Sequence, residues 1–395
     1  MPNQIKACVV SEKKVTLLAK LPRLYSMEFI DLQTQRERIQ PQLEKRIQAV
    51  LEMGQFILGP EVAELERKLE AFTGAKHAIT VANGTDALQL ALMALRIGPG
   101  DEVITTPFSF VATTEAIVLL GATPVFVDID PKTYNLDPAK ISAAVTSKTK
   151  AILPVSLYGL SCDIEALEAV ALKHKVAIIE DAAQSFGASQ KKRRSCSWAT
   201  LSCSSFFPSK PLGCYGDGGA CFTNDSELAN LLKQIRAHGQ DRRYHHPILG
   251  VNSRLDTLQA AVLLAKMEIF EDEIERRQGV AKNYHEGLKD VAGTPTIPPD
   301  NISVFAQYTI QVKNRDAFLE HMKRRGIPTA VHYPTPLHLQ PAFSRFGKGV
   351  GSMLISEAAS ERVVSLPMHP YMKREDQMRV IAAVQEFAML NKDRD

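Results

Sequence analysis

Short apolar runs alternate with helical hydrophobic patterns over most of the first half of the chain. The apolar runs predict strands at 77–82, 102–106, 124–128, 150–155 and 176–180, with two more at 200–206 and 219–223. The helical patterns fall between the first five runs, at 85–96, 110–121, 137–145 and 163–174. Strands that alternate with helices are typical of βαβ units, which build a parallel sheet covered on both faces. The sequence therefore predicts an α/β fold with a mainly parallel central sheet.

The chain changes character on either side of this region. Residues 41–74 predict two helices separated by a loop, which Gly54, Gly59 and Pro60 mark. A long helix is predicted at about 253–290, followed by strands at 305–313 and 328–333 and helices at 315–325 and 374–390. We therefore expect a large α/β domain at 27–260, and a linking helix with a smaller C-terminal α+β domain at 261–395.

The first 26 residues carry no motif and are predicted to be a poorly ordered extension. They are basic, but they lack an apolar stretch long enough for a secretory signal. Met27 begins a run, Met-Glu-Phe-Ile-Asp-Leu, that is typical of a natural start. No apolar run in the sequence approaches the roughly 20 residues that a membrane-spanning helix requires.

The overall composition narrows the class of protein. With 45% hydrophobic and 23% charged residues among 395, the chain has the balance of a globular enzyme. A formal net charge of +3 gives no reason to expect nucleic acid or a membrane as a partner. The six cysteines contain no C-x-x-C pair, so we expect no metal site and reduced thiols in a cytoplasmic protein.

Two turns at predicted strand ends carry polar groups that suit a bound cofactor. In the first, Asn83-Gly84-Thr85 opens a helix, where free N–H groups and the helix dipole favour a phosphate. A simple capping turn is the alternative, because Asn and Thr are ordinary helix caps. In the second, Asp181 and Gln184 follow the strand 176–180, at the kind of strand end where open α/β sheets bind ligands. The alternative for Asp181 is a helix cap, and for Gln184 a place facing solvent.

Lys210 lies in an apolar, glycine-flanked segment, Ser205-Phe-Phe-Pro-Ser-Lys-Pro-Leu-Gly213. An apolar setting lowers the pKa of a lysine and frees its amine to react with a carbonyl group. Ser205 and Ser209 add hydroxyl groups that suit a phosphate. A further strand end carries Phe108 and Phe110, of which we favour Phe110 as an aromatic platform over the alternative of core packing.

Together these features match the needs of pyridoxal 5′-phosphate (PLP), which requires a reactive lysine, a phosphate site and a carboxylate for its ring nitrogen. The longer motifs around them resemble the DegT/DnrJ/EryC/StrS family of PLP-dependent sugar aminotransferases. These motifs are FILGPEVAELE (56–66), NGTDAL (83–88), GDEVITTPFSFVAT (100–113), EDAAQSFGA (180–188), SFFPSKPLGCYGDGGA (205–220) and NSRLDTLQAA (252–261). The resemblance covers about residues 27–390. It implies the type I aminotransferase fold, a homodimer with shared active sites and glutamate as amino donor.

The resemblance also implies a role for individual residues. Lys210 would bond covalently to the cofactor, Asp181 would hold the pyridine nitrogen and Gln184 would lie against the ring. The phosphate would be bound by Gly84, Thr85 and Ser205, with Asn252 reaching it from the other subunit.

A narrower resemblance concerns the substrate. The segments HGQDRRYHH (238–246), AVHYPTPLHLQ (330–340) and SLPMHPY (365–371) are similar to family members that aminate a UDP-linked 2-acetamido-3-oxo-glucuronate for O-antigen synthesis. A substrate with a pyrophosphate and a carboxylate calls for cationic partners. The candidate substrate-binding residues are Arg242, Arg243, His245, His246, Arg254, His332, Tyr333 and His338.

Other functions remain open at this point. The chain could aminate another nucleotide-linked 3- or 4-keto sugar, or catalyse dehydration or epimerisation on the same fold. Family members with His in place of the reactive lysine are dehydratases, and Lys210 disfavours that branch. A non-catalytic regulator is a further alternative, which the intact set of Lys210, Asp181 and Gln184 disfavours. A dinucleotide-binding enzyme is weaker still, since no G-x-G-x-x-G opens a predicted helix.

Overall fold

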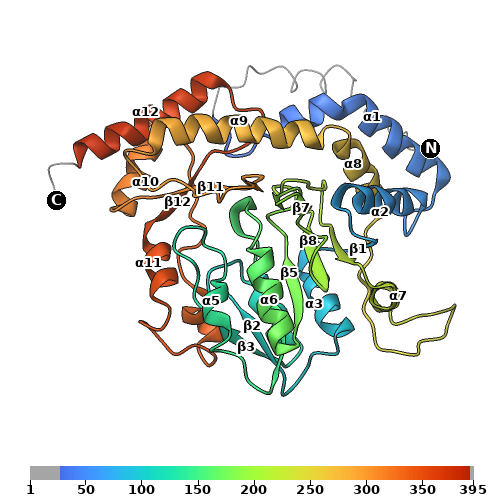
Figure 1. Cartoon of the computed structure of the whole chain (residues 1–395). Coiled ribbons are helices and arrows are strands. Elements are labelled where there is room, and N and C mark those ends of the chain that lie inside the picture. The colour runs from blue at the N-terminus through green and yellow to red at the C-terminus, as the bar shows by residue number, and fades with distance from the viewer. Residues whose placement is uncertain (1–26, 392–395) are drawn as a thin grey trace, which may run out of the picture.

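The protein is built around a seven-stranded sheet, as seen in a computed structural model that describes residues 27–391 (Figure 1). The strand order is β1-β9-β8-β5-β4-β2-β3. The strands are β1 (His77–Val81), β2 (Glu102–Thr105), β3 (Thr123–Phe126), β4 (Thr149–Leu153), β5 (Ala177–Asp181), β8 (Leu201–Ser205) and β9 (Gly219–Thr223). Only β9 pairs antiparallel, with both of its neighbours, and the other pairs are parallel. The predicted α/β fold with a mainly parallel sheet is therefore confirmed.

Helices cover both faces of the sheet because its central strands are apolar on both faces. In β5, Ile178 packs with the helix α6 (Ile164–His174), whereas Ile179 packs on the opposite face. The helices on the Ile179 face are α3 (Gly84–Ala94), α4 (Ala112–Leu119) and α7 (Ser226–Ile235). The helices α2 (Pro60–Thr73) and α8 (Thr257–Met267) pack around Phe206 and Phe222 on the same face as α6.

A second hydrophobic core forms beyond the sheet. It joins α9 (Phe270–Leu288), α10 (Arg315–Arg324) and α12 (Arg374–Leu390) to the two-stranded sheet of β11 (Tyr308–Gln311) and β12 (Val363–Leu366). Figure 1 shows α9 running along the upper edge of the molecule, from the end of α8 to this core. The predicted domain boundary at 260/261 falls inside α8, and the division into two domains stays a prediction.

Several predicted elements differ from the structure. The long helix at 253–290 is two helices, α8 and α9, because the chain breaks at Glu268 and Ile269 and buries Phe270 in the neighbouring core. The predicted strand at 328–333 contributes only an isolated bridge between Ala330 and Ser365, and β12 takes its place beside β11. The first helix begins before residue 41, since α1 (Leu32–Met53) is capped by the Asp31 carboxylate and continues through Pro41.

The remaining elements are short or peripheral. They are α5 (Pro138–Ile141), which replaces the longer predicted helix at 137–145, α11 (Leu354–Arg362), and a three-stranded sheet of β10 (Asn301–Ile302), β6 (Ser189–Gln190) and β7 (Arg193–Arg194). Within residues 27–391, every helix is too short or too polar to cross a membrane. The extension predicted at residues 1–26 lies outside the described residues.

One ionisable side chain of α8 is buried in the interior of the protein. Lys266 is 1% exposed, and its ammonium lies 4.3 Å from the centre of the Tyr215 ring. Its Nζ makes no hydrogen bond to the described residues. Burial lowers the pKa of Lys266 to about 8. Folding therefore favours the uncharged amine, and the charged form costs stability at neutral pH.

Replacing Lys266 with Met is expected to stabilise the protein by about 1–3 kcal/mol at pH 7, since the apolar chain fills a similar volume without a charge. Because the pKa of Lys266 is lower in the folded state, the charged amine destabilises the parent protein fully below about pH 8. This destabilisation decreases as the pH rises toward the ordinary pKa of lysine. Urea unfolding of both proteins at pH 7 and pH 9.5 measures this. A difference that grows with pH would contradict the assignment.

Candidate active site

A cavity of about 450 Å³ opens at the carboxyl ends of the parallel strands. Asp181 ends β5 and Ser205 ends β8, while Val155 follows β4 and Phe110 follows β2. Because these strand ends meet at one edge of the sheet, residues far apart in sequence line one site. The lining residues are Asn83, Gly84, Thr85, Leu88, Ser109, Phe110, Ala112, Thr113, Val155, Asp181, Ala183, Gln184, Ser205, Phe207, Ser209, Lys210, Asp217, Gln307, His332 and Tyr333.

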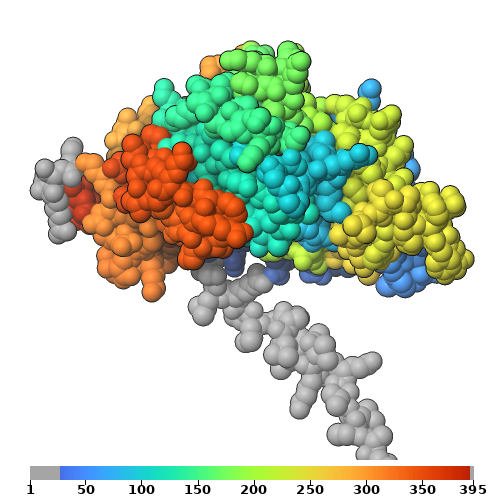
Figure 2. Space-filling model, turned by 90° about the horizontal axis from the view of Figure 1, so that it is seen from below, coloured from blue at the N-terminus to red at the C-terminus, as the bar shows by residue number. Residues whose placement is uncertain are grey.

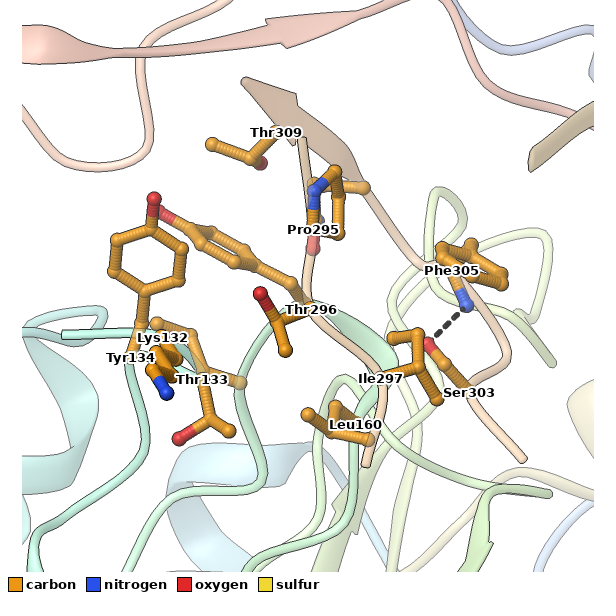
Figure 3. A pocket seen from close by; sticks show the side chains of 13 residues that line it. Lys132, Thr133, Tyr134, Leu160, Pro295, Thr296, Ile297, Ser303, Phe305 and Thr309 are labelled. Atoms are coloured by element: carbon orange, nitrogen blue, oxygen red, sulfur yellow. Dashed lines mark hydrogen bonds between the residues drawn. The ribbon is translucent and has the colours of Figure 1, made fainter. Parts of the chain in front are cut away.

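A second pocket lies beside this cavity but has a different character. Figure 3 shows it between the loop that carries Tyr134 and the segment that carries Pro295 and Thr296. Its volume is about 20 Å³, which is room for about one water molecule. Gln307 lines both pockets. The larger cavity is therefore the candidate active site.

Lys210 reaches the cavity from a tight turn after β8. The turn is closed by backbone bonds from Phe206 N to Gly218 O and from Cys214 N to Phe206 O, each 2.7 Å. Gly213 is required here, because a Cβ atom at this position would lie 2.6 Å from the Phe207 carbonyl oxygen. Burial lowers the pKa of Lys210, and the nearby Asp181 carboxylate opposes that shift. The turn thus presents an amine that loses its proton more readily than an exposed lysine does.

Asp181 is buried at the end of β5, and two hydrogen bonds orient its carboxylate. The Thr113 hydroxyl donates to Oδ2 at 2.8 Å, and the Ala183 N–H donates to Oδ1 at 3.1 Å. Burial raises the pKa of Asp181, whereas these two bonds and the positive charge of Lys210 lower it. The two hydrogen bonds and the Lys210 ammonium thus favour the ionised carboxylate of Asp181, whereas burial favours its protonated form.

The predicted phosphate-binding residues meet at the start of α3. Asn83 caps this helix, and its side chain accepts a hydrogen bond from the Asp86 N–H at 2.8 Å. A Cβ atom on Gly84 would lie 2.6 Å from Cβ of Ser205. Only glycine therefore allows the backbone at the start of α3 to approach the end of β8 this closely. The helix start and the Ser205 and Ser209 side chains therefore face one space.

Aromatic and amide groups complete the lining. Phe110 lines the cavity and is 54% exposed, whereas Phe108 is fully buried in a hydrophobic cluster, and the role of Phe110 as a platform stays a prediction. The Gln184 amide is held on both sides, because its Oε1 accepts from the Tyr158 N–H and its Nε2 donates to the Tyr333 hydroxyl. Gln184 thus fixes Tyr333 at the edge of the cavity.

His332 lines the cavity but is not the cation that the sequence suggested. Burial, with a contribution from the charge of Lys210, lowers the pKa of His332 to about 4. Its Nδ1 lies 2.8 Å from the Ser365 hydroxyl. At neutral pH this imidazole is uncharged and serves as a hydrogen-bonding group.

Tyr333 also lines the cavity, whereas the remaining predicted substrate-binding residues, and Asn252 of the predicted phosphate site, lie outside this protomer's cavity. His338 is buried and its Nε2 lies 3.1 Å from Glu357, so the structure assigns it a place in the fold. Asn252 and Arg254 follow the segment 236–251, which projects beyond α7 at the edge of the molecule (Figures 1 and 2). Arg242, Arg243, His245 and His246 are exposed on that segment.

Some lining residues were not predicted as site residues. Thr113 and Ser109 line the cavity and are linked by a 3.0 Å hydrogen bond between their hydroxyl groups. Both belong to the motif at 100–113, and their spacing of four residues at the start of a predicted helix was the available signal. Gln307 comes from the second half of the chain, and nothing in its local sequence distinguishes it.

The residues present fit PLP. The cavity combines a helix start and hydroxyl groups for a phosphate, a buried carboxylate for a ring nitrogen and an amine for an aldehyde. The close approach of Gly84 to Ser205 leaves backbone N–H groups and a hydroxyl group beside each other, as a phosphate requires.

Comparisons with known proteins agree with this geometry. The DegT/DnrJ/EryC1/StrS aminotransferase family model matches residues 37–385. The chain is 59% identical over 347 residues to the UDP-2-acetamido-2-deoxy-3-oxo-D-glucuronate aminotransferase of Pseudomonas aeruginosa, covering 88% of this chain and 96% of that protein.

Two solved structures share the fold. A DegT DnrJ EryC1 StrS aminotransferase from Brucella abortus has a TM-score of 0.90 and 45% identity, covering 92% of this chain and 99% of that one. NtdA from Bacillus subtilis, solved with bound cofactor PMP, has a TM-score of 0.83 and 31% identity, covering 94% and 85% of the two chains. The protein therefore belongs to the DegT/DnrJ/EryC1/StrS aminotransferase family and is a PLP-dependent transaminase.

Proposed function

We propose that this enzyme transfers an amino group from glutamate to the 3-keto group of a UDP-linked 2-acetamido-3-oxo-glucuronate. The reaction would take place in the cytoplasm, as a step of bacterial O-antigen sugar synthesis. Amino transfer rests on one observation above all, the placing of Lys210 and Asp181 in the same cavity. The choice of sugar rests on the 59% identity to the Pseudomonas aeruginosa enzyme.

Bound PLP supplies the electron sink that lets an amino group leave one carbon and join another. Lys210 would hold the cofactor covalently until the incoming amine displaces it, and its freed Nζ would then take and return the proton of the reacting carbon. The lowered pKa of Lys210 suits this task, because the uncharged amine is the form that accepts a proton. Asp181 would keep a negative charge beside the ring nitrogen, and the start of α3 with Ser205 would bind the phosphate.

We propose further that two chains form a homodimer with shared active sites. Asn252 and Arg254 would then reach the cavity of the other subunit, as would Arg242 on the projecting segment. This segment carries Tyr244 and Leu249, which are 81% and 90% exposed. The last turn of α1 and the connection to α2 add a run of exposed apolar side chains, and such patches are typical of interfaces. They are Leu51, Met53, Phe56, Ile57 and Leu58.

The substrate is tested with a panel of UDP- and dTDP-linked keto sugars, with glutamate as donor and the product identified by mass and NMR. We expect the highest kcat/KM for the 3-keto uronate. A higher kcat/KM for a neutral 3- or 4-keto sugar would replace the proposed substrate. Release of 2-oxoglutarate in a single turnover separates amino transfer from dehydration or epimerisation, neither of which consumes glutamate.

Arg254 is the proposed partner of the uronate carboxylate. Its Nε is buried without a hydrogen-bond partner among the described residues, so the guanidinium retains donor capacity. Losing a charge-assisted pair costs about 1.5–3 kcal/mol, or roughly ten- to a hundredfold. We expect Arg254→Ala to lower kcat/KM for the uronate by that factor and to change the glutamate half-reaction less.

The two half-reactions are measured separately by stopped-flow absorbance. The control is Arg324→Ala on α10, where an exposed arginine pairs with Glu320 at 3.6 Å, far in sequence from every site residue. An equal loss in both half-reactions would mean that Arg254 supports the interface or binds glutamate, and would remove it from the choice of sugar.

A further inference from the structure

A short chain of hydroxyl groups ends on the Asp181 carboxylate. Ser109 Oγ lies 3.0 Å from Thr113 Oγ1, which in turn lies 2.8 Å from Asp181 Oδ2. Ser109, Thr113 and Asp181 are all buried, and Thr113 is completely inaccessible. Ser109 precedes α4, Thr113 lies in its first turn and Asp181 ends β5. These two hydrogen bonds therefore link the start of the helix α4 to the end of the strand β5.

The direction of these hydrogen bonds follows from the donors available. An ionised carboxylate only accepts, so the single hydroxyl proton of Thr113 must point at Asp181. Thr113 then has no proton left for Ser109, and the Ser109 hydroxyl must donate to it. Two hydroxyl dipoles are thereby aligned toward one negative charge, and aligned hydrogen bonds strengthen each other in a buried setting.

We propose that Thr113 is a positioning residue, which with Ser109 holds Asp181 ionised and oriented toward the ring nitrogen of the cofactor. This inference rests on the proposed role of Asp181. The Ala183 N–H occupies Oδ1 from another side, so two donors set the plane of the carboxylate. The carboxylate has about four acceptor sites, and two remain for the ring nitrogen.

The charge on Asp181 depends on this support because its surroundings otherwise oppose ionisation. Burial is the largest influence on the pKa of Asp181 and raises it, while the Thr113 hydroxyl is the first of the influences that lower it. The other titratable groups that interact with Asp181 are Lys210, Tyr333, Cys162, Cys196 and Cys203. Of these only Lys210 can carry a positive charge, so the hydrogen-bond donors are the other support for the anion.

The neighbouring residue provides a matched control. Thr114 is also completely buried on α4, but its hydroxyl makes no hydrogen bond to the described residues. Thr113→Val and Thr114→Val therefore remove the same atom from adjacent positions, and only the first removes a donor to Asp181. Thr113→Ser keeps the donor and loses a methyl group, which separates the hydrogen bond from packing.

The test measures the dissociation constant of PLP from each apoprotein by equilibrium dialysis, and the pH at which the absorbance of the bound cofactor changes. We expect Thr113→Val to weaken PLP binding about tenfold, the effect of one hydrogen bond to a charged group. The spectral transition should shift to lower pH, since a weaker anion stabilises the ring proton less. Ser109→Ala should show a smaller change in the same direction.

Thr113→Ser should remain within about threefold of the parent protein, as should Thr114→Val. Equal effects of Thr113→Val and Thr114→Val on both measurements would overturn the proposal. If Thr113→Val does not fold, Ser109→Ala and Thr113→Ser carry the comparison, and an unshifted transition in Ser109→Ala would count against the chain of donors. Asp181→Asn in the same series tests the underlying assignment: no effect there would remove the role of Asp181 itself.

Discussion

Lys210→Ala is expected to abolish steady-state transamination, with a loss on the order of 10⁴-fold or more. The substitution removes both the covalent attachment of the cofactor and the base that moves the proton, and general acid–base catalysis alone contributes roughly 10²–10⁴-fold. The fold should persist, because the turn around Lys210 is held by backbone bonds that do not involve its side chain. The phosphate site is also intact, so we expect PLP to bind without a covalent bond.

Three measurements check this expectation. Amino-group transfer is followed by 2-oxoglutarate release, and covalent attachment by mass spectrometry after borohydride reduction. Retention of PLP is followed by dialysis. The control is Lys191→Ala, since Lys191 is exposed and pairs with Glu165 on the surface. Transamination within tenfold of the parent, or a borohydride-stable adduct in the variant, would show that another amine is the reactive one.

The residues proposed to carry the chemistry could be singled out from the sequence because they lie in contiguous motifs at the ends of apolar strands. Lys210 follows β8 and Asp181 ends β5, so the strand pattern alone places both at one edge of the sheet. Thr113 was not predicted as a site residue because its contact with Asp181 spans 68 residues and joins two separate units. Contacts of this kind depend on how α4 packs against the sheet, and the sequence pattern within either segment does not predict that packing.

Two predictions in the C-terminal part of the chain were wrong because they too depend on tertiary contacts. The apolar residues of the segment 328–333 favour a strand, yet the segment begins with Pro328 and is followed by Pro334, and β12 occupies the position beside β11. His332 was predicted as a cation from its residue type. Its burial beside Lys210, which leaves it neutral, is a property of the tertiary structure. The charge state of a histidine follows its surroundings more than its sequence neighbours.

Asp181→Asn should cost transamination on the order of 10³-fold while changing the stability of the protein little. Asn has nearly the same shape, and its amide oxygen can still accept from Thr113 at the position of Oδ2, while its NH2 group at the position of Oδ1 loses the bond from the Ala183 N–H. What is lost is the negative charge beside the ring nitrogen, and removing one electrostatic group from a water-excluded site typically costs 10²–10³-fold. The neutral Asn side chain is less costly to bury than a carboxylate, and this gain offsets part of the hydrogen-bond energy that is lost. The free energy of unfolding should therefore change by less than about 1 kcal/mol.

Both quantities are measured on the same preparation, with kcat from single-turnover release of 2-oxoglutarate and the free energy of unfolding of the apoprotein from urea titration. Asp217→Asn serves as the control, because Asp217 also lines the cavity but is exposed. A rate within a few-fold of the parent, on the order of 1 kcal/mol in the barrier, would mean that Asp181 only shapes the strand end. A large loss of stability without a spectral change in the bound cofactor would lead to the same conclusion. A large loss of rate with unchanged stability would place the charge of Asp181 in the chemistry, since shape and packing are preserved.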